Sequence, residues 1–155
     1  MANIVVKTIK KVVKEDVRDY LEGEVSKCGT QGCVLSNERG GVYGFAIKLT
    51  EEEKKDVFNE FNGKKYAKTV EEWKTIGDDF YPLYWGKDIN LGFRLREHTI
   101  SNKSVRSIQL NEKVFLRGKE VLYGAVICAK REDNEKKMRE QYPDILKTVP
   151  LPSKD

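Results

Sequence analysis

The first part of the chain changes from a helical pattern of apolar residues to a strand pattern. Apolar residues over 5–21 recur at a period near 3.6, which predicts a helix over some or all of residues 3–25. Glycine, serine and asparagine within residues 28–39 indicate a loop. Two glycines at 40–41 then precede a nearly continuous apolar segment, which predicts a strand over residues 42–49.

Two helix starts are predicted by their capping residues. Thr50 is followed three positions later by Glu53, the spacing of a capping box, and an Asn-Gly pair ends the expected helix. Thr69 and Glu72 repeat the signature and predict a shorter helix that Gly77 ends. Both helices lie between the first and second expected strands.

The second half of the chain predicts two more strands and two more helices. The order of elements indicates a small α/β (α+β) domain over residues 1–155, with one short three-stranded sheet flanked by helices. A further short strand over 114–116 is an open alternative. The expected elements are a strand over 80–85 that runs into a turn at Gly86, a helix after Lys87, a buried strand over 121–128 and a charged helix over about 132–142.

Composition excludes several classes of protein. No apolar run approaches the roughly 18 to 20 residues that a membrane span needs, and the lysine-rich N-terminal segment does not have the pattern of a signal peptide. Three cysteines, an odd number, argue against a disulfide framework. A zinc site would require Cys28, Cys33 and Cys128 together with His98, whereas reduced thiols are the simpler interpretation. We therefore expect a cytoplasmic protein.

Positive charge is concentrated in the second half of the chain. Residues 84–119 contain eight basic and three acidic residues, so their net charge of +5 exceeds the +4 of the whole chain. A basic region on a nearly neutral body is typical of a protein that binds a polyanion, although scattered cations also solvate ordinary surfaces. Within this region, Arg96, Lys103 and Arg106 are predicted to contact nucleic acid.

Several side chains suited to a phosphodiester lie within one short segment. Tyr84 ends a strand, and Arg94 and His98 follow four residues apart, on one face of the expected helix. His98 is the only histidine of the chain. Arg94 could grip a phosphate through two parallel hydrogen bonds, and Lys87 could add a point charge.

These residues resemble the motifs of the GIY-YIG nuclease family. The first motif of that family is similar to Gly41-Val42-Tyr43, and the second is similar to Tyr84-Trp85-Gly86. Arg94 and His98 match the arginine and histidine of the family's first helix. The family glutamate matches Glu135 best, with Glu132 and Glu140 as near alternatives.

The resemblance implies an antiparallel sheet and one-step hydrolysis of DNA by in-line attack of water, with RNA as an alternative substrate. One divalent cation, Mg²⁺ or Mn²⁺, would be held by Glu135. Tyr43 would act as general base or orient the water, and Tyr84 would support the water or a phosphate oxygen. Arg94 would stabilise the pentavalent phosphate. Lys87 and His98 would assist Arg94 in this role.

The resemblance also implies a division of the chain. Residues 1–39 would form an N-terminal helical extension, and residues 40–148 would form the core. About forty residues separate the two tyrosine motifs instead of the usual ten or so, and the excess over 50–79 is expected to be a helical insertion.

One further departure keeps a second function open. The family places an asparagine about a dozen residues after its glutamate, and residues 146–150 contain none. The matched tyrosines, arginine, histidine and glutamate favour a metal-dependent endonuclease. The absent asparagine favours a nucleic-acid or nucleotide-binding module on the same fold that has lost activity.

Overall fold

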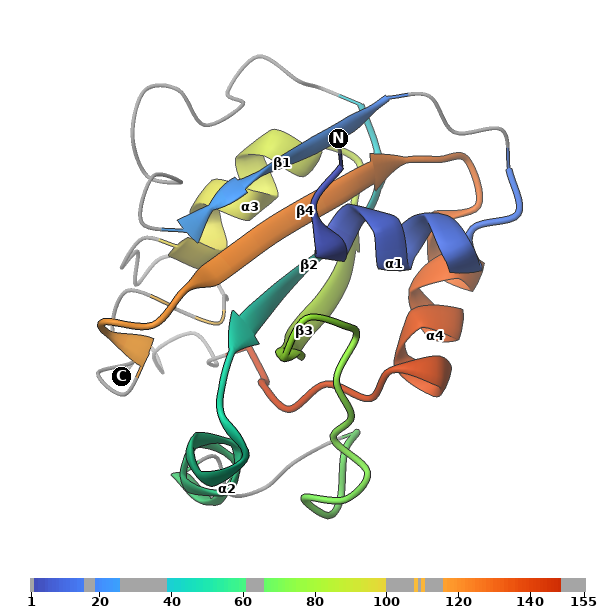
Figure 1. Ribbon diagram of the computed structural model, residues 1–155. Coiled ribbons are helices and arrows are strands. Elements are labelled where there is room, and N and C mark those ends of the chain that lie inside the picture. The colour runs from blue at the N-terminus through green and yellow to red at the C-terminus, as the bar shows by residue number, and fades with distance from the viewer. Residues whose placement is uncertain are drawn as a thin grey trace, which may run out of the picture.

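The computed structural model describes residues 2–15, 19–25, 39–60, 66–99, 108, 110 and 116–148, and these contain four helices and four strands (Figure 1). In chain order the elements are α1 (Ile4–Val12), β1 (Tyr20–Glu24), β2 (Gly41–Lys48), α2 (Glu51–Glu60), β3 (Phe80–Asp88), α3 (Leu91–Thr99), β4 (Val121–Ile127) and α4 (Arg131–Gln141). None of the described helices is long and apolar enough to cross a membrane.

The strands form one antiparallel sheet in the order β1-β4-β2-β3. The α+β class and the antiparallel pairing are as expected, but the expected number of three strands is wrong. The additional strand is β1, which the helical pattern over 3–25 had included. Tyr20 packs with the cluster under α1 and Leu21 packs with the cluster on the other face. Neighbouring side chains that pack on opposite faces are typical of a strand, whereas a helix at the surface buries residues along one side only.

Two apolar layers cover the two faces of the sheet. On one face, α1 and α4 enclose a core that includes Val42, Trp85 and Met138. On the other face, α3 and the segment after α4 enclose Tyr43, Phe45 and the other large residues of that layer. The near-continuous apolar sequence of β2 reflects this burial on both sides, and β4 lies in the sheet interior as predicted.

Glycines opposite aromatic residues allow β2 and β3 to pair closely. Tyr43 pairs with Gly86, and Gly44 pairs with Trp85. A Cβ atom at Gly86 would lie 2.3 Å from the Tyr43 hydroxyl, and one at Gly44 would lie 2.2 Å from the Trp85 ring. Each ring therefore lies across the glycine of the neighbouring strand. The turn predicted at Gly86 is wrong, because Gly86 lies inside β3.

A bulge in β3 interrupts the alternation of side chains between Leu83 and Tyr84. Phe45 pairs with Tyr84 and Ala46 pairs with Pro82, which leaves Leu83 as an extra residue. Both Leu83 and Tyr84 consequently pack on the same side of the sheet, although neighbouring strand residues normally face opposite sides. The Leu83 carbonyl accepts hydrogen bonds from the backbone N–H groups of residues 145 and 146, at 3.3 and 2.9 Å.

The capping predictions are confirmed at one site and corrected at the other. Thr50 and Glu53 exchange reciprocal hydrogen bonds of 3.0 and 3.2 Å at the start of α2. Thr69 accepts from the Glu72 N–H at 3.2 Å, but the segment forms a turn and no helix. Among the described residues of the region proposed as a helical insertion, α2 is thus the one helix. The alternative strand at 114–116 lies largely outside the described residues.

Substitution of Gly86 by alanine should destabilise the sheet by about 2 kcal/mol or more, because the new methyl group would overlap the Tyr43 ring. Urea unfolding of the Gly86→Ala variant measures this loss. In a Tyr43→Leu background, the penalty of Gly86→Ala should largely disappear. Equal penalties in the two backgrounds would show that the ring is not the cause.

Candidate active site at the edge of the sheet

Four of the expected site residues come together on one face of the sheet. β2 supplies Tyr43, β3 supplies Tyr84, and α3 supplies Arg94 and His98. The centroid of the His98 ring lies 5.4 Å from that of Tyr43 and 5.1 Å from that of Tyr84. The two tyrosine rings lie 6.2 Å apart. The predicted proximity of these four residues is therefore present in the fold.

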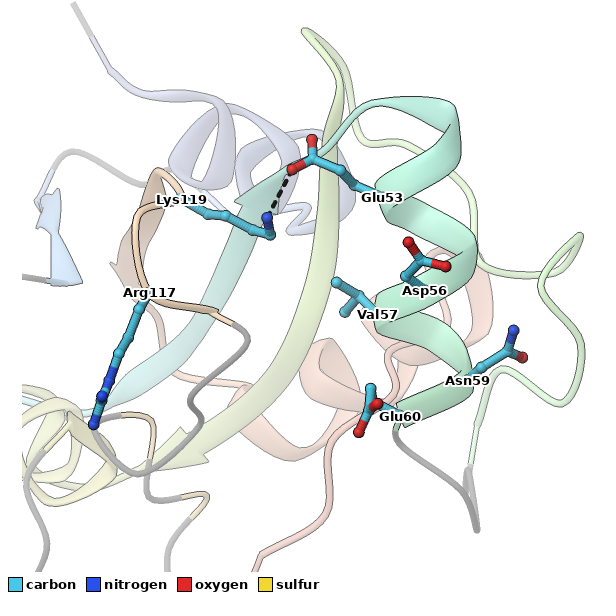
Figure 2. Close-up of a pocket in the computed structure, with 7 residues that line it drawn as sticks. All are labelled: Glu53, Asp56, Val57, Asn59, Glu60, Arg117 and Lys119. Atoms are coloured by element: carbon cyan, nitrogen blue, oxygen red, sulfur yellow. Dashed lines mark hydrogen bonds and ion pairs between the residues drawn. The ribbon is translucent and has the colours of Figure 1, made fainter.

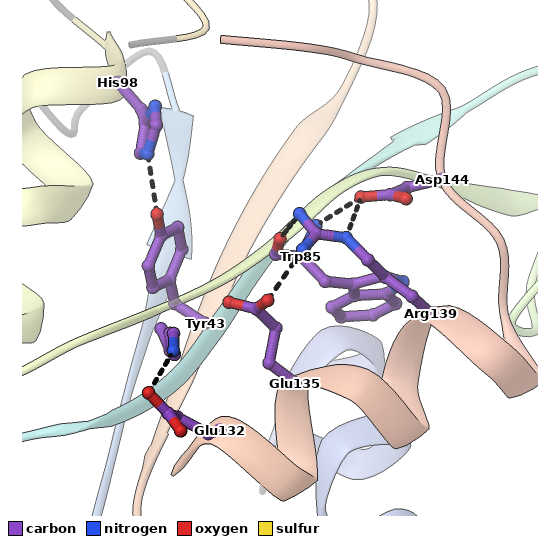
Figure 3. Close-up of polar contacts among 8 residues, drawn as sticks. Tyr43, Trp85, His98, Glu132, Glu135, Arg139 and Asp144 are labelled. Carbon is purple, nitrogen blue, oxygen red and sulfur yellow. Dashed lines mark hydrogen bonds and ion pairs between the residues drawn. The ribbon is translucent and has the colours of Figure 1, made fainter. Parts of the chain in front are cut away.

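A buried hydrogen bond joins Tyr43 to His98 (Figure 3). The Tyr43 hydroxyl lies 2.6 Å from His98 Nε2, and the two residues are 1% and 0% exposed. His98 Nδ1 accepts from the backbone N–H of Ile108 at 3.0 Å. Because Nδ1 accepts, the proton of the neutral ring lies on Nε2, which donates to the tyrosine oxygen.

Burial keeps both members of this pair uncharged near neutral pH. Desolvation raises the pKa of Tyr43 well above its usual value, with a further increase from Tyr84, while Arg94 acts in the opposite direction. Desolvation, followed by the charge of Arg94, lowers the pKa of His98 well below its usual value. The pair therefore provides a fixed phenol rather than a phenolate base.

Arg94 is the cation next to this pair. Its side chain is 17% exposed, and its charge acts on both Tyr43 and Tyr84. Nε lies 4.0 Å from the Asp88 carboxylate and Nη1 lies 3.5 Å from that of Glu97. Both distances exceed those of a strong charged hydrogen bond, so these two carboxylates hold the guanidinium only loosely, while a side-chain hydrogen bond links it to Tyr43.

Arg139 and Asp144 form a second charged group with Glu135 at the outer edge of β3. Arg139 Nη1 donates to Glu135 Oε1 at 2.8 Å, and Nε donates to Asp144 Oδ2 at 3.3 Å. Nη2 donates to the Trp85 carbonyl, and the Trp85 N–H donates to Asp144 Oδ2 at 2.8 Å. Figure 3 shows this network beside β3.

Sequence reasoning missed two members of that group. Arg139 follows Glu135 by four residues, a spacing that predicts an ion pair along a helix and could have indicated this contact. Asp144 follows a proline in a segment without periodicity, so no local pattern indicated that it is buried.

The carboxyl group of Asp144 is buried with incomplete hydrogen bonding. Its Oδ1 atom has no hydrogen-bond partner among the described residues. Desolvation raises the pKa of Asp144 to about 6, although Arg139 and the Trp85 N–H lower it.

The remaining expected residues lie apart from the Tyr43–His98 pair or outside the description. Lys87 Nζ pairs with Glu132 Oε1 at 2.8 Å, and this contact lowers the pKa of Glu132. Glu132 and Glu140 are both exposed. Arg96 belongs to α3, although its side chain is outside the description, and Lys103 and Arg106 lie outside the described residues.

A single carboxylate is the available metal ligand at the site. Within the described part of the chain, no group of three or more histidine, cysteine, aspartate or glutamate residues could hold an ion. The side chain of Glu135 is 20% exposed, and its Oε2 atom makes no hydrogen bond to a described residue. Mg²⁺ usually binds proteins through one or two carboxylates, with waters and substrate phosphates completing its shell. Glu135 fits that requirement.

A separate pocket of about 560 Å³ lies between α2 and the turn before β4 (Figure 2). Its charged lining contains Glu53, which pairs with Lys119 at 2.7 Å, and Arg117 on the opposite side. None of the expected site residues that the structure describes lines it, so it is separate from the cluster of Tyr43, Tyr84, Arg94 and His98.

Comparison with models of known protein families, with curated proteins and with solved structures gives no match. The resemblance to GIY-YIG nucleases therefore rests on the motif residues of the chain.

Removal of the Tyr43 hydroxyl should leave the buried His98 Nε2–H without its acceptor. We expect the Tyr43→Phe variant to lose about 1 to 3 kcal/mol of unfolding free energy, measured by urea denaturation at pH 8. The matched control is Tyr20→Phe, because the ring of Tyr20 is only partly buried in β1. That control should change stability by less than about 0.5 kcal/mol. Similar losses in both variants would contradict the assigned hydrogen bond.

Asp144 should make stability fall as the pH rises from about 4 to about 6. Its pKa is about 6 in the folded chain against an ordinary value of 3.8, so the folded state binds the proton more tightly. The unfolded chain loses its proton first as the pH rises, which favours unfolding by up to about 3 kcal/mol.

The Asp144→Asn variant should lack this pH dependence, because the amide keeps an acceptor but does not titrate. The measurement is the unfolding free energy of both proteins across that range. The low pKa of His98 makes stability fall as the pH decreases in both proteins, so it cancels in the difference between them. Parallel curves would contradict the assignment to Asp144.

Proposed function

We propose that the protein is a metal-dependent endonuclease that hydrolyses phosphodiester bonds in DNA by one-step attack of water. The observation that carries this proposal is the cluster of Tyr43, Tyr84, Arg94 and His98, which three different elements bring within contact distance. These residue types also form the GIY-YIG motifs that the chain resembles. RNA is the alternative substrate of the same site.

In this proposal Arg94 binds the scissile phosphate and stabilises its additional charge during attack. Its loose contacts with Asp88 and Glu97 support this role, since a phosphate oxygen can replace carboxylates at 4.0 and 3.5 Å. Tyr84 is partly exposed beside Arg94 and orients the attacking water or a phosphate oxygen. These two residues form the part of the site that contacts substrate.

Tyr43 and His98 have a supporting role in the proposed mechanism. Both are buried and neutral, so they hold the site in position. Tyr43 is not a phenolate, and the basic nitrogen of neutral His98 already accepts from the Ile108 N–H, so neither residue removes a proton from water. The burial of Tyr43 disfavours both roles expected for it, and Tyr84 is the tyrosine that orients the attacking water in this proposal.

The cation, Mg²⁺ or Mn²⁺, would bind Glu135 through the Oε2 atom. When bound, it would lower the pKa of a coordinated water and balance charge on the phosphate. Lys87 supplies positive charge near the end of β3, and Arg96, Lys103 and Arg106 remain the predicted contacts to the DNA backbone.

A binding module without activity is the second candidate. The observation in its favour is the ion pair between Glu135 and Arg139, because a guanidinium already occupies one carboxylate oxygen of the expected metal ligand. The absence of an asparagine over residues 146–150 points in the same direction.

A plasmid-nicking assay with Mg²⁺ or Mn²⁺ distinguishes the two candidates. We expect the parent protein to nick DNA, and Arg94→Gln and Glu135→Gln to lower the rate at least about 100-fold. The matched control is Glu52→Gln, which removes an exposed carboxylate from α2 and should keep the parent rate.

The outcomes of the assay are separable by measuring DNA binding on the same proteins. Binding that weakens with salt, without cleavage, would replace the enzyme by the binding module. A parent protein that does not bind DNA and does not cleave it would exclude both candidates. Cleavage that survives both substitutions would come from a contaminant and would count against the assigned residues.

A further inference from the structure

Arg139 is almost completely enclosed, although it lies on a charged and largely exposed helix. Its side chain is only 12% exposed. The ring of Tyr66 lies 4.4 Å from the guanidinium carbon and the ring of Tyr84 lies 5.0 Å from it. Cation–π contacts at these distances add to the hydrogen bonds made in the plane of the group. The guanidinium therefore has partners both at its edge and against its faces.

Such enclosure fixes the position of a charge that would otherwise be costly to bury. A buried arginine requires paired charges and satisfied donors, and each of the three nitrogens of Arg139 has an acceptor. Asp144, with a fully buried side chain, balances the charge and also accepts from the backbone of β3. The position of Arg139 is thus set from two sides, by the strand edge and by the segment after α4.

Two of the residues that the proposed function needs are held by this one side chain. Glu135 gives one carboxylate oxygen to Arg139, which fixes the direction of the other. Tyr84 places its ring against the same guanidinium, while Arg94 acts on it electrostatically from another side. Arg139 therefore connects the expected metal ligand to the residue that contacts substrate.

Arg139 is a weaker candidate than Arg94 for binding the phosphate directly. Its hydrogen bond to Glu135 is 2.8 Å long, whereas the closest carboxylate contact of Arg94 is 3.5 Å. Its exposure is also lower than the 17% of Arg94. Arg94 is the guanidinium that can turn to a ligand, and Arg139 is the one that the fold retains.

We propose that Arg139 is a positioning residue, which orients Glu135 and Tyr84 for the reaction while its charge weakens cation binding at Glu135. This inference rests on the proposed function, because it concerns the metal ligand and the water-orienting tyrosine of that function. It gives α4 a role beyond supplying the carboxylate. It also predicts that cation affinity and turnover change in opposite directions when Arg139 is replaced.

The test compares Arg139→Gln and Arg139→Lys with the parent protein. Arg139→Gln removes the charge beside Glu135, so its affinity for Mn²⁺ alone, measured by calorimetry without DNA, should increase on the order of tenfold. Its kcat for DNA nicking at saturating Mn²⁺ should decrease about tenfold or more, because Glu135 and Tyr84 lose their orientation. Arg139→Lys keeps the charge without the planar fork, so it should retain the parent affinity for Mn²⁺ and lose turnover.

Two controls separate this effect from loss of charge and from loss of folding. Lys137→Gln removes an exposed cation from the same helix and should match the parent in both measurements. Arg139→Gln combined with Asp144→Asn removes both buried charges, so it remains informative if the single variant does not fold. The double variant should show the tighter Mn²⁺ binding and the slower turnover of Arg139→Gln. Thermal unfolding of each protein establishes the folded fraction used for comparison.

A measurement without metal keeps the inference distinct from the proposed function. In Arg139→Gln, the NMR signals of the Tyr84 ring should shift and become more accessible to a soluble relaxation agent than in the parent protein. Lys137→Gln should leave both unchanged. If the parent protein neither binds Mn²⁺ nor cleaves DNA, the proposed function fails, and the Tyr84 signals still decide the positioning role. Unchanged Tyr84 signals, or Mn²⁺ affinity and kcat that move together in Arg139→Gln, would overturn the inference.

Discussion

The structure depends on the close pairing of β2 with β3 through two reciprocal aromatic–glycine contacts. Tyr43 lies across Gly86, and Trp85 lies across Gly44. A side chain at either glycine would push the rings away, so the strands could not pair in this register. Because the register sets the face on which each residue lies, the same contacts place Tyr43 on the α3 side and Trp85 on the α1 and α4 side. The position of the candidate active site therefore follows from two residues that have no side chains.

Burial and charge divide the candidate site into two parts. The Tyr43–His98 pair is buried from solvent, and this burial keeps both groups neutral. The Glu135–Arg139–Asp144 group carries charge and lies at the strand edge, where three polar side chains and the backbone of Trp85 hydrogen-bond to one another. The neutral part can hold a fixed shape, and the charged part can respond to a bound cation or phosphate.

The sequence predicts the residues around His98 well and the charged group of Glu135, Arg139 and Asp144 poorly. Tyr84, Arg94 and His98 belong to one strand-turn-helix segment, so their proximity follows from local geometry. The boundary of β3 was misplaced, because glycine at position 86 resembles a turn residue when its partner Tyr43 is not known. Asp144 is buried through contacts with a strand 59 residues earlier, and no periodicity within its own segment indicates such a contact. The strand β1 was missed because its apolar residues continue the spacing of α1, whereas its pairing with β4 is long-range.

Tyr84 is the residue that brings the two parts together. It lies on the same face as Tyr43, because it pairs with Phe45 while Tyr43 pairs with Gly86, two residues further along β3. The extra residue of the bulge turns Leu83 to that face as well, whereas Trp85 lies on the other face, and the Trp85 backbone remains at the edge for Arg139 and Asp144. The Leu83 carbonyl also binds the backbone that follows Asp144, so the bulge and the buried carboxylate fix each other. Tyr84 thus contacts the neutral pair and the charged group at the same time.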